Sequence, residues 1–285
     1  MTVGTETTSS APSRVQEHAV RFWRFTDRIG LHELVVVVVA FLVYFLIRGA
    51  VVGREGEAIA RGLDLIELER RMGIYWELQM QSWILDHYWL IKTMNWVYFW
   101  GHMPLVIVFA VWLYFWHRRF YRLVRNAFLA SGAIAVVIYA LFPVAPPRLI
   151  PFAGYVDTMA VFDRVGYQAQ EVSMFVNPFA AVPSLHFGWS LLLGLMVGYV
   201  GRSALAWAIA VAWPIAMFFS IVMTGNHFIL DAVAGAIVSF AGLGIALGLE
   251  RVRPYVHGWL AERIPAIRHT PPTKPASAPA ESSTR

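Results

Sequence analysis

Long apolar stretches alternate with short polar ones along most of this chain. A helix that crosses a membrane needs about 20 apolar residues, and six stretches approach or exceed that length. They are residues 34–52, 88–116, 127–142, 185–200, 204–223 and 228–249. We therefore predict an all-α fold, a polytopic membrane helix bundle with six transmembrane helices.

The polar stretch between the first two predicted spans has a helical pattern of its own. In residues 54–81, Ile59, Leu63, Ile66 and Met72 recur near helical spacing among Glu and Arg residues. This pattern indicates an amphipathic helix that lies on the outer membrane interface. An extramembrane helix packed against the bundle is the alternative that the pattern leaves open.

Changes of composition near both ends divide the chain into three parts. Residues 1–13 are rich in Ser and Thr, and residues 265–285 are rich in Pro, Ala, Ser and Thr, which is typical of disordered segments. We predict a disordered or amphipathic cytoplasmic tail at residues 1–28, a six-span membrane domain at 29–252 and a disordered cytoplasmic tail at 253–285.

The composition excludes several classes of protein. Hydrophobic residues make up 58% of the chain and charged residues 14%, whereas soluble domains carry about 25% charged residues, so an ordinary cytosolic globule is excluded. The absence of cysteine excludes disulfides, a thiolate nucleophile and cysteine-ligated metal centres. The net charge of +5 is what basic residues beside membrane spans produce, so we expect no nucleic-acid partner.

Six spans place both termini on the same side of the membrane. That side carries most of the basic residues, including those at residues 118–125 and in the C-terminal tail. The positive-inside rule therefore places both termini in the cytoplasm of a multi-pass cell-membrane protein. The arginines of residues 54–71 lie on the other side and reduce this bias. The loop at residues 143–183 and the turn at 224–226 then face the extracytoplasmic side.

Two histidines stand at the outer ends of predicted spans, a depth where ionisable side chains are costly and are functional candidates. His186 follows Pro183 and Ser184 at the start of the fourth span, and His227 follows Asn226 at the start of the sixth. Ser184 and Asn226 are residue types that cap helix N-termini. Because both helices start on the same face, their free N–H groups and positive dipole ends form a natural anion site.

Two further residues at this level add chemistry. Asp231 lies four positions after His227 on the same helix face. It can hold the imidazole in one tautomer and activate the other ring nitrogen as a nucleophile. Arg148 follows the third span, and its planar guanidinium suits phosphate. A structural His–Asp pair, a proton relay in a transporter and a zinc site formed by the histidines and the aspartate are the alternatives.

The two histidine segments carry a family resemblance. PSLH at residues 183–186 and HFILD at residues 227–231 resemble the second and third signatures of the type 2 phosphatidic acid phosphatase superfamily. The resemblance covers roughly residues 50–250, and the pair of histidine motifs combined with six spans is a specific signal. It implies a membrane enzyme of the phosphatase and phosphotransferase type.

Other motifs are similar to one branch of that superfamily. APPR at residues 145–148 and GNH at residues 225–227 look like the inositol phosphorylceramide synthase branch, whose members are inositol phosphotransferases. Asn95, Tyr98 and His102 in the second predicted span are a further likeness. We take these three residues as candidate substrate contacts, with a buried hydrogen-bonding role as the alternative for His102.

Three positions depart from the general superfamily pattern. Leu141 stands where that pattern has a lysine seven residues before the arginine. Ser220 is followed by Ile221 where the pattern has a serine–arginine pair, and Leu185 replaces the glycine of the second motif. The pocket therefore offers fewer cations to a phosphate than a typical superfamily phosphatase, which favours the synthase-like branch.

The resemblance implies a mechanism with a phosphohistidine intermediate. His227 would attack the phosphorus and Asp231 would orient it and balance its charge. His186 would protonate the leaving oxygen and then serve as base for the acceptor. The candidate phosphate-binding residues are Arg148, Ser184 and Asn226, although capping its own helix is the first expectation for Ser184. The mechanism requires no metal and no other cofactor.

We predict an integral membrane enzyme that transfers a phosphoinositol-like headgroup from a phospholipid donor to a hydroxyl acceptor at the extracytoplasmic leaflet. Its partners are membrane lipids, with an anionic phospholipid or a polyprenyl phosphate as substrate. A lipid phosphate or polyprenyl diphosphate phosphatase is one alternative, because water as acceptor would give hydrolysis. A transporter or lipid-binding membrane scaffold is the alternative from outside enzymes.

The sixth predicted span contains glycines at positions that neighbouring helices can use. Gly235, Gly242 and Gly244 are small residues of the kind that let two membrane helices approach closely. We expect all three to lie at helix contacts.

Overall fold

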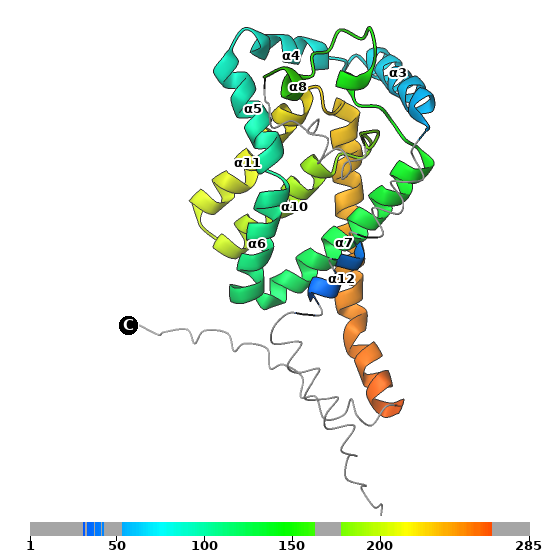
Figure 1. Ribbon diagram of the computed structural model, residues 1–285. Helices are drawn as coiled ribbons and strands as arrows, with labels where there is room; N and C mark the ends of the chain where they lie inside the picture. The colour runs from blue at the N-terminus through cyan, green and yellow to red at the C-terminus, as the bar shows by residue number, and fades with distance from the viewer. Residues whose placement is uncertain are drawn as a thin grey trace, which may run out of the picture. The chain divides into compact units, whose positions relative to one another are not determined.

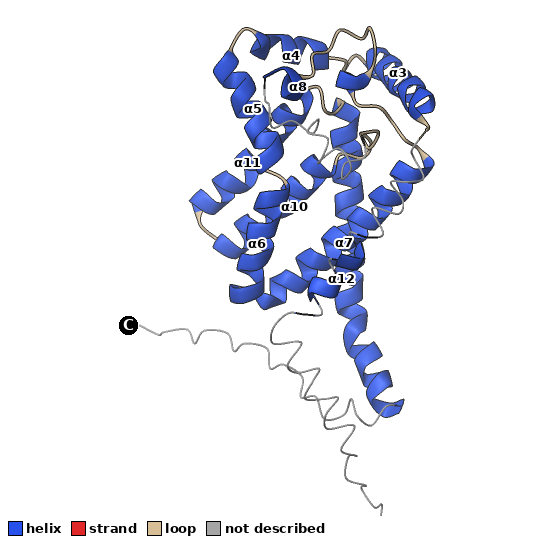
Figure 2. Cartoon of the chain, viewed as in Figure 1, coloured by secondary structure: helices blue, strands red, loops and turns tan. Residues whose placement is uncertain are grey.

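The computed structural model describes residues 53–162 and 178–263, with side chains to Val256, and also residues 31, 33–36, 38–40 and 42. Helices make up the regular structure of this part of the chain (Figure 2). Within the same residues, the β-type pairing is an isolated bridge between Val144 and Ala180. The all-α prediction is confirmed for the described residues. The predicted tail at residues 1–28 lies outside them, whereas residues 253–263 of the predicted tail at 253–285 are described and form the end of a helix.

The described helices are α3 (Glu55–Met72), α4 (Glu77–Leu85), α5 (Tyr88–Trp100), α6 (Met103–Trp116), α7 (Arg118–Leu141), η1 (Pro147–Leu149), α8 (Thr158–Phe162), α10 (Leu185–Gly201), α11 (Ala204–Met223) and α12 (Ile229–Arg263). The chain divides into two compact units. One comprises Val38–Leu249 and contains every candidate site residue. The other comprises Met1–Val37 with Glu250–Arg285, and its described part is helical.

Several helices have the length and composition of membrane spans. By these criteria α7, α11 and Ile229–Val256 of α12 each qualify alone, and α5 with α6 would make a fourth span if the bent pair is counted as one. α10 is apolar but has only 17 residues. These helices correspond to the second to sixth predicted spans, and most of the first, residues 34–52, lies outside the described residues. The six-span count therefore stays a prediction.

The second predicted span is broken in the middle. α5 ends at Trp100, α6 begins at Met103, and their axes differ by 46°. A Cβ atom on Gly101 would lie 2.5 Å from Trp213 of α11, so only glycine fits at this joint. Pro104 lies in the first turn of α6, where its missing N–H costs nothing. The joint leaves His102 between the two helices.

The segment predicted as one amphipathic helix forms two helices, α3 and α4. Gly73 ends α3 in the left-handed conformation, with φ of 71°, which glycine adopts without steric cost. The buried positions of α3 are Ala58, Gly62, Ile66 and Glu69, so one face of this helix packs against the protein. In Figure 1, α3, α4 and α8 lie at the same end of the helices. A location at a membrane interface stays a prediction.

Two arginines near the start of α3 donate hydrogen bonds to carbonyl groups at the end of α7. The last carbonyls of a helix have no partner within the helix. Arg54 donates to the carbonyl of Ala140 at 2.6 Å, and Arg61 donates to the carbonyl of Leu141 at 3.3 Å. Arg61 also lies over the ring of Phe142, 3.9 Å from its centroid. Two of the basic residues on the predicted outer side therefore have a structural reason to be there.

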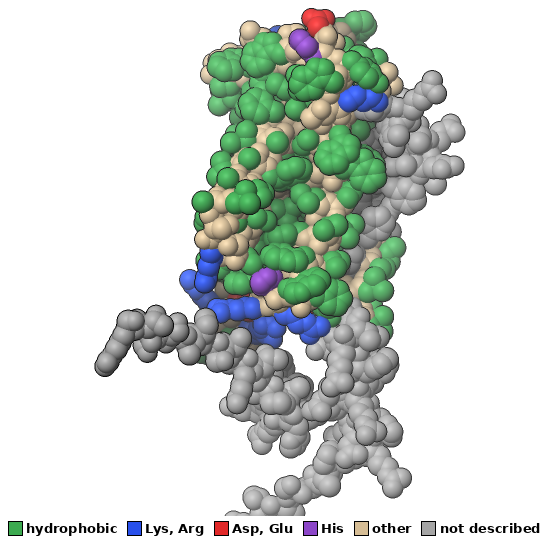
Figure 3. All heavy atoms as spheres, turned by 90° about the vertical axis from the view of Figure 1, so that its left-hand side faces the viewer, with side chains coloured by type: hydrophobic (Ala, Val, Ile, Leu, Met, Phe, Trp, Pro, Cys, Tyr) green, Lys and Arg blue, Asp and Glu red, His purple; other side chains and the backbone are tan. Residues whose placement is uncertain are grey.

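One face of the molecule shows a broad apolar band with Lys and Arg side chains gathered below it (Figure 3). Such a band is typical of a surface that contacts lipid. Basic residues are concentrated where α7 begins and where α10 leads into α11, at Arg118, Arg119, Arg122, Arg125 and Arg202. The candidate site is built from the opposite ends of these helices. This separation fits the predicted orientation, which itself stays a prediction.

Glycines let α12 approach its neighbours. A Cβ atom on Gly235 would lie 2.1 Å from the carbonyl oxygen of Ser184, and one on Gly242 would lie 2.6 Å from the carbonyl oxygen of Ala127 in α7. On the facing side, a Cβ atom on Gly188 of α10 would lie 2.4 Å from the carbonyl oxygen of Gly235. The prediction for Gly235 and Gly242 is confirmed. That for Gly244 is wrong, because no described atom of a neighbouring segment lies within 4 Å of its Cβ position.

Replacing Gly235→Ala should force α10 and α12 apart. We expect a loss of about 1–3 kcal/mol of stability, the usual cost of overpacking, and a loss of activity, because the same contact sets the spacing of the two histidine-bearing segments. Thermal unfolding in detergent and a turnover assay measure both effects. Gly244→Ala is the matched control in the same helix and should be neutral or stabilising. Equal behaviour of the two variants would contradict the prediction.

Candidate active site

Backbone contacts bring three distant segments together at the candidate site. Val144 donates to the carbonyl of Phe179 at 2.9 Å and accepts from the N–H of Ala181. The hydroxyl of Tyr139 in α7 donates to the carbonyl of Pro183 at 2.6 Å. The backbone N–H of Ser184 donates to the carbonyl of Asp231 at 2.9 Å. The segment that leads into α10 is therefore fixed against both the end of α7 and the start of α12.

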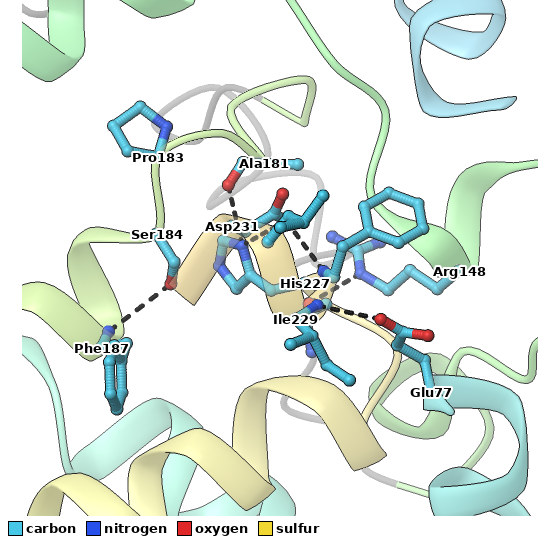
Figure 4. A network of polar contacts seen from close by, with 12 residues as sticks. Glu77, Arg148, Ala181, Pro183, Ser184, Phe187, His227, Ile229 and Asp231 are labelled. Atoms are coloured by element: carbon cyan, nitrogen blue, oxygen red, sulfur yellow. Dashed lines mark hydrogen bonds and ion pairs between the residues drawn. The ribbon is translucent and has the colours of Figure 1, made fainter. Parts of the chain in front are cut away.

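The two partners of His227 determine which ring nitrogen is free. Its Nδ1 lies 2.9 Å from the carbonyl oxygen of Ala181 and 3.2 Å from Oδ2 of Asp231, and both oxygens are directed at the ring in Figure 4. A carbonyl oxygen only accepts hydrogen bonds, so Nδ1 carries the proton. The lone pair of the neutral ring is then on Nε2. This arrangement leaves Nε2 available, and the role of His227 as nucleophile stays a prediction.

Asp231 combines two tasks at the start of α12. Its Oδ2 also accepts from the N–H of Phe228 at 2.9 Å, which satisfies a backbone donor just before the helix begins at Ile229. The carboxylate is fully buried, and its Oδ1 has no hydrogen-bond partner among the described residues. The residue that caps α12 is therefore Asp231, and the prediction of Asn226 as its cap is wrong.

The side chain of Asn226 instead holds Arg148. Its Oδ1 accepts from Nε of Arg148 at 2.7 Å, and its Nδ2 donates to the hydroxyl of Thr224 at 2.8 Å. Arg148 also donates from Nη1 to Asp157 at 3.2 Å, and its backbone N–H donates to Gly225. These contacts fix the guanidinium beside the turn that carries His227. A phosphate at this position would have to share Arg148 with Asp157.

His186 lies in a stack of aromatic rings. Its ring centroid is 5.7 Å from that of His227, 4.3 Å from that of Tyr98 and 3.9 Å from that of His102. The joint between α5 and α6 places His102 there, buried and packed also on Trp189. The structure therefore brings Tyr98 and His102 together with both predicted catalytic histidines. Their contact with substrate stays a prediction.

Ser184 and Asn95 have structural partners. The hydroxyl of Ser184 accepts from the N–H of Phe187 at 3.5 Å, so Ser184 caps α10 as expected. Asn95 exchanges two hydrogen bonds with Thr158, which fix α5 to α8. Phosphate binding by Ser184 and substrate contact by Asn95 stay predictions.

The N–H groups at the start of α12 already have anionic partners. Ile229 donates its N–H to Oε1 of Glu77 at 2.9 Å, and Leu230 donates to Oε1 of Glu69 at 2.8 Å. Both glutamates are fully buried, and Figure 4 shows Glu77 reaching Ile229. The expectation that these amides form an open anion site for the substrate is wrong for α12, because two protein carboxyl groups fill it.

Burial, followed by the hydrogen bond with Glu77, raises the pKa of Glu69 from 4.5 to about 9. The nearby charges of Glu77 and Asp231 act in the same sense, while the hydrogen bond from Leu230 opposes them. Glu69 therefore holds a proton at neutral pH. Three carboxyl groups meet at the start of α12.

Sequence reasoning missed three buried polar residues that build the site. They are Glu69, Glu77 and Gln81. The side chain of Gln81 bonds both the N–H and the carbonyl of Val156 and also donates to the carbonyl of Met223. A signal for Glu69 was present, because it continues the helical stripe of small and apolar residues Ala58, Gly62 and Ile66. No comparable pattern marks Glu77 or Gln81.

Within the described ranges, no group of three or more His, Asp or Glu side chains is arranged to hold a metal ion. The two histidines and Asp231 that would make the zinc alternative are instead arranged with His227 bonded to Asp231 and His186 stacked on rings. The zinc alternative gains no support from these residues.

A comparison of the sequence with known protein families matches most of the helical region to one family. The family model described as the PAP2 superfamily matches residues 63–245, a range that contains every candidate site residue. The match is to the superfamily and does not distinguish the inositol phosphorylceramide synthase branch within it. No curated protein and no solved structure matches the sequence significantly.

His227 and Asp231 should respond differently to substitution. His227→Ala removes the nucleophile and should reduce turnover to background. Asp231→Asn keeps an oxygen that can accept from Phe228, and Ala181 still holds the proton on Nδ1, so only the negative charge is lost. We expect turnover to fall by about 10²–10⁴-fold, the usual range for one group that assists proton transfer. Phosphoester turnover and thermal unfolding of each variant check this, and wild-type turnover by Asp231→Asn would contradict it.

Proposed function

The chain belongs to the PAP2 superfamily, and we propose that it transfers a phospho-headgroup, phosphoinositol-like, from a phospholipid to a hydroxyl acceptor. As a member of this superfamily it is a phosphatase or phosphotransferase. The observation that carries the proposal is the pairing of His227 Nδ1 with both Ala181 and Asp231. That pairing leaves Nε2 free for attack on phosphorus.

In the first step, Nε2 of His227 attacks the phosphorus of the donor. A P–N bond forms, and the P–O bond to the glycerol oxygen of the lipid breaks. His186, whose ring lies 5.7 Å from that of His227, donates a proton to the leaving oxygen. Asp231 stabilises the positive ring of the phosphohistidine, because it bonds Nδ1 and is shielded from water by full burial.

In the second step, the acceptor hydroxyl gives its proton to His186 and its oxygen attacks the phosphorus. The P–N bond breaks, and His227 returns to the neutral form with the proton on Nδ1. An alcohol acceptor gives transfer of the headgroup, and water gives hydrolysis. The nature of the acceptor therefore decides which reaction the same residues perform.

The cation supply at the site supports transfer of a diester headgroup over hydrolysis of a monoester. Among the described residues, Arg148 is the cation beside the nucleophile, and its guanidinium also pairs with Asp157. At the position where a superfamily phosphatase has arginine, Ile221 is fully buried in the core, and Ser220 before it donates to the carbonyl of Met94. A phosphate diester carries one negative charge and needs less cationic compensation than a monoester.

An apolar groove beside the site supports a lipid substrate. It has a volume of about 460 Å³ and is lined by side chains of α10 and α11, including Phe187, Leu195, Trp207 and Ile215. Phe187 directly follows His186, so the groove begins at the catalytic end of α10. Between Phe187 and Leu195 it extends roughly 12 Å along the helix. We assign the groove to a hydrocarbon chain of the donor.

The reaction can be identified by incubating the purified full chain in mixed micelles with a panel of phospholipids and added alcohols. Mass spectrometry should detect diacylglycerol released from phosphatidylinositol together with phosphoinositol on the alcohol. Both products should vanish in His227→Ala. Free phosphate from monoesters alone would identify a lipid phosphatase instead. Equal background from wild type and variant across the panel would overturn the phosphohistidine mechanism and favour a non-catalytic scaffold.

Filling the groove should impair long-chain donors selectively. In Ile215→Trp, we expect kcat/KM for a long-chain donor to fall by about threefold to tenfold, because a chain in the micelle loses only packing contacts when it is displaced. A dihexanoyl donor should be turned over as by wild type. Ile237→Trp adds the same side chain at an exposed apolar position of α12 and is the control. An equal effect on both donors would argue against the assignment.

A further inference from the structure

Two glutamates from the segment before α5 accept hydrogen bonds from the first residues of α12, the helix that follows the turn carrying His227. Oε1 of Glu77 accepts from Ile229 and Oε1 of Glu69 accepts from Leu230, at 2.9 and 2.8 Å. Asp231 accepts from Phe228 in the same turn. Three successive backbone N–H groups are thus each bonded to a different carboxyl group. Of these three carboxyl groups, the mechanism proposed above uses only that of Asp231.

Burying the carboxyl groups of Glu69 and Glu77 would be a costly way merely to cap a helix. A serine or asparagine hydroxyl or amide would satisfy the same N–H groups without a buried charge, whereas two buried carboxyl groups beside Asp231 repel one another unless a proton is held between them. Neither Oε2 atom has a hydrogen-bond partner among the described residues. One carboxylic acid and one carboxylate at this position satisfy both the N–H groups and each other.

The pair is coupled to His227 through packing as well as hydrogen bonds. Phe228, which follows the nucleophile, is fully buried against Ala58 and Ile66 of α3. Gln81 of α4 donates to the carbonyl of Met223 at the end of α11. The turn between α11 and α12 is therefore held by contacts with α3 and α4 as well as by the two helices that it joins.

We propose that Glu69 and Glu77 are positioning residues that share one proton, occupy the N-terminal amides of α12 and thereby hold His227 and Asp231 in the reactive arrangement. This inference deepens the proposed function and rests on it for its catalytic consequence. Because the amides of α12 are filled, the substrate phosphate binds at the side of Arg148. The single negative charge of the pair favours the positive ring that forms on His227 during attack.

The titratable groups around the pair come from several segments of the fold. Glu69 faces Glu77 of α4 and Asp231 of α12, and His227 is bonded to that aspartate. The hydroxyl of Tyr155 donates to that of Tyr75 at 3.0 Å, and burial raises the pKa of Tyr155, with the hydrogen bond to Tyr75 and the charges of both glutamates acting in the same direction. Arg70 lies over the ring of Tyr75. Every acidic neighbour disfavours a second negative charge on the pair.

The pH dependence follows from the pKa of Glu69, which is raised to about 9. Between about pH 4.5 and pH 9 the folded protein holds a proton that the unfolded chain releases, so the free energy of unfolding falls as pH rises through this window. Near pH 9 the second negative charge appears beside Asp231 and the phosphate. Turnover should then decline because the two carboxylates repel each other and no longer hold the start of α12 in place.

Three variants separate positioning from bulk stability. Glu69→Gln mimics the protonated acid, and Glu69→Ala removes both hydrogen bonds. Glu67→Gln alters an exposed residue of the same helix that pairs only with Arg71 and is the control. At pH 7 we expect Glu69→Ala to lower kcat by about 10- to 100-fold with KM little changed, the range typical of groups that orient a reacting residue. Glu69→Gln should recover most of this loss and should extend activity above pH 9, where wild type and Glu67→Gln decline.

Two readouts on the full chain in micelles need no substrate. Infrared spectroscopy should show a protonated carboxyl band at pH 7 that disappears in Glu69→Gln. Hydrogen exchange should show slow amides at residues 229–230 that become fast in Glu69→Ala. A band unchanged by Glu69→Gln, or equal protection in Glu69→Ala, would overturn the inference. So would a pH profile of Glu69→Gln identical to wild type. If wild type turns over no substrate, the proposed function fails, and these two readouts still decide the state of the pair.

Discussion

The first backbone N–H groups of α12 need hydrogen-bond acceptors at a largely buried position, and this constraint organises the site. An unpaired buried amide costs several kcal/mol in a lipid-like environment. The first donors of α12 are satisfied by Asp231, Glu77 and Glu69 in turn. Because two of these acceptors come from α3 and α4, the nucleophile cannot be positioned by the membrane helices alone. The polar segment before α5 therefore helps to build the candidate site.

Close helix contacts supply the second half of that framework. α10 and α12 meet where Gly188 faces Gly235, which brings the starts of both helices to the same level. The joint at Gly101 then turns the chain so that His102 packs on His186. Each contact excludes even one extra carbon atom, so the distance between the two histidines is set by backbone packing. Rigid backbone contacts hold reacting groups more accurately than long flexible side chains do.

The parts of the site that the sequence predicts correctly are those that follow from local spacing. His227 and Asp231 are four residues apart on one turn, and their contact follows from helix geometry. The capping role of Asn226 was mispredicted because the helix starts at Ile229, two residues later than a cap at Asn226 would give, and the side-chain amide of Asn226 bonds Arg148 instead. Glu69 was missed because its negative charge argues for a solvated face, whereas a held proton removes that charge. Local pattern cannot reveal a partner 161 residues away.

The charge balance of the site bears on the choice between its two reactions. Arg148 is opposed by Asp157, and the histidines are opposed by Asp231 and by the single charge of the Glu69–Glu77 pair. Two like charges about 4 Å apart cost roughly 4 kcal/mol at an effective dielectric constant of 20. A monoester dianion carries one more negative charge than a diester monoanion, so it would incur this repulsion one additional time. On the proposed mechanism, a phospholipid diester is therefore the better match to the described cations, and its cleavage would leave the phospho-headgroup on His227 for an alcohol to accept.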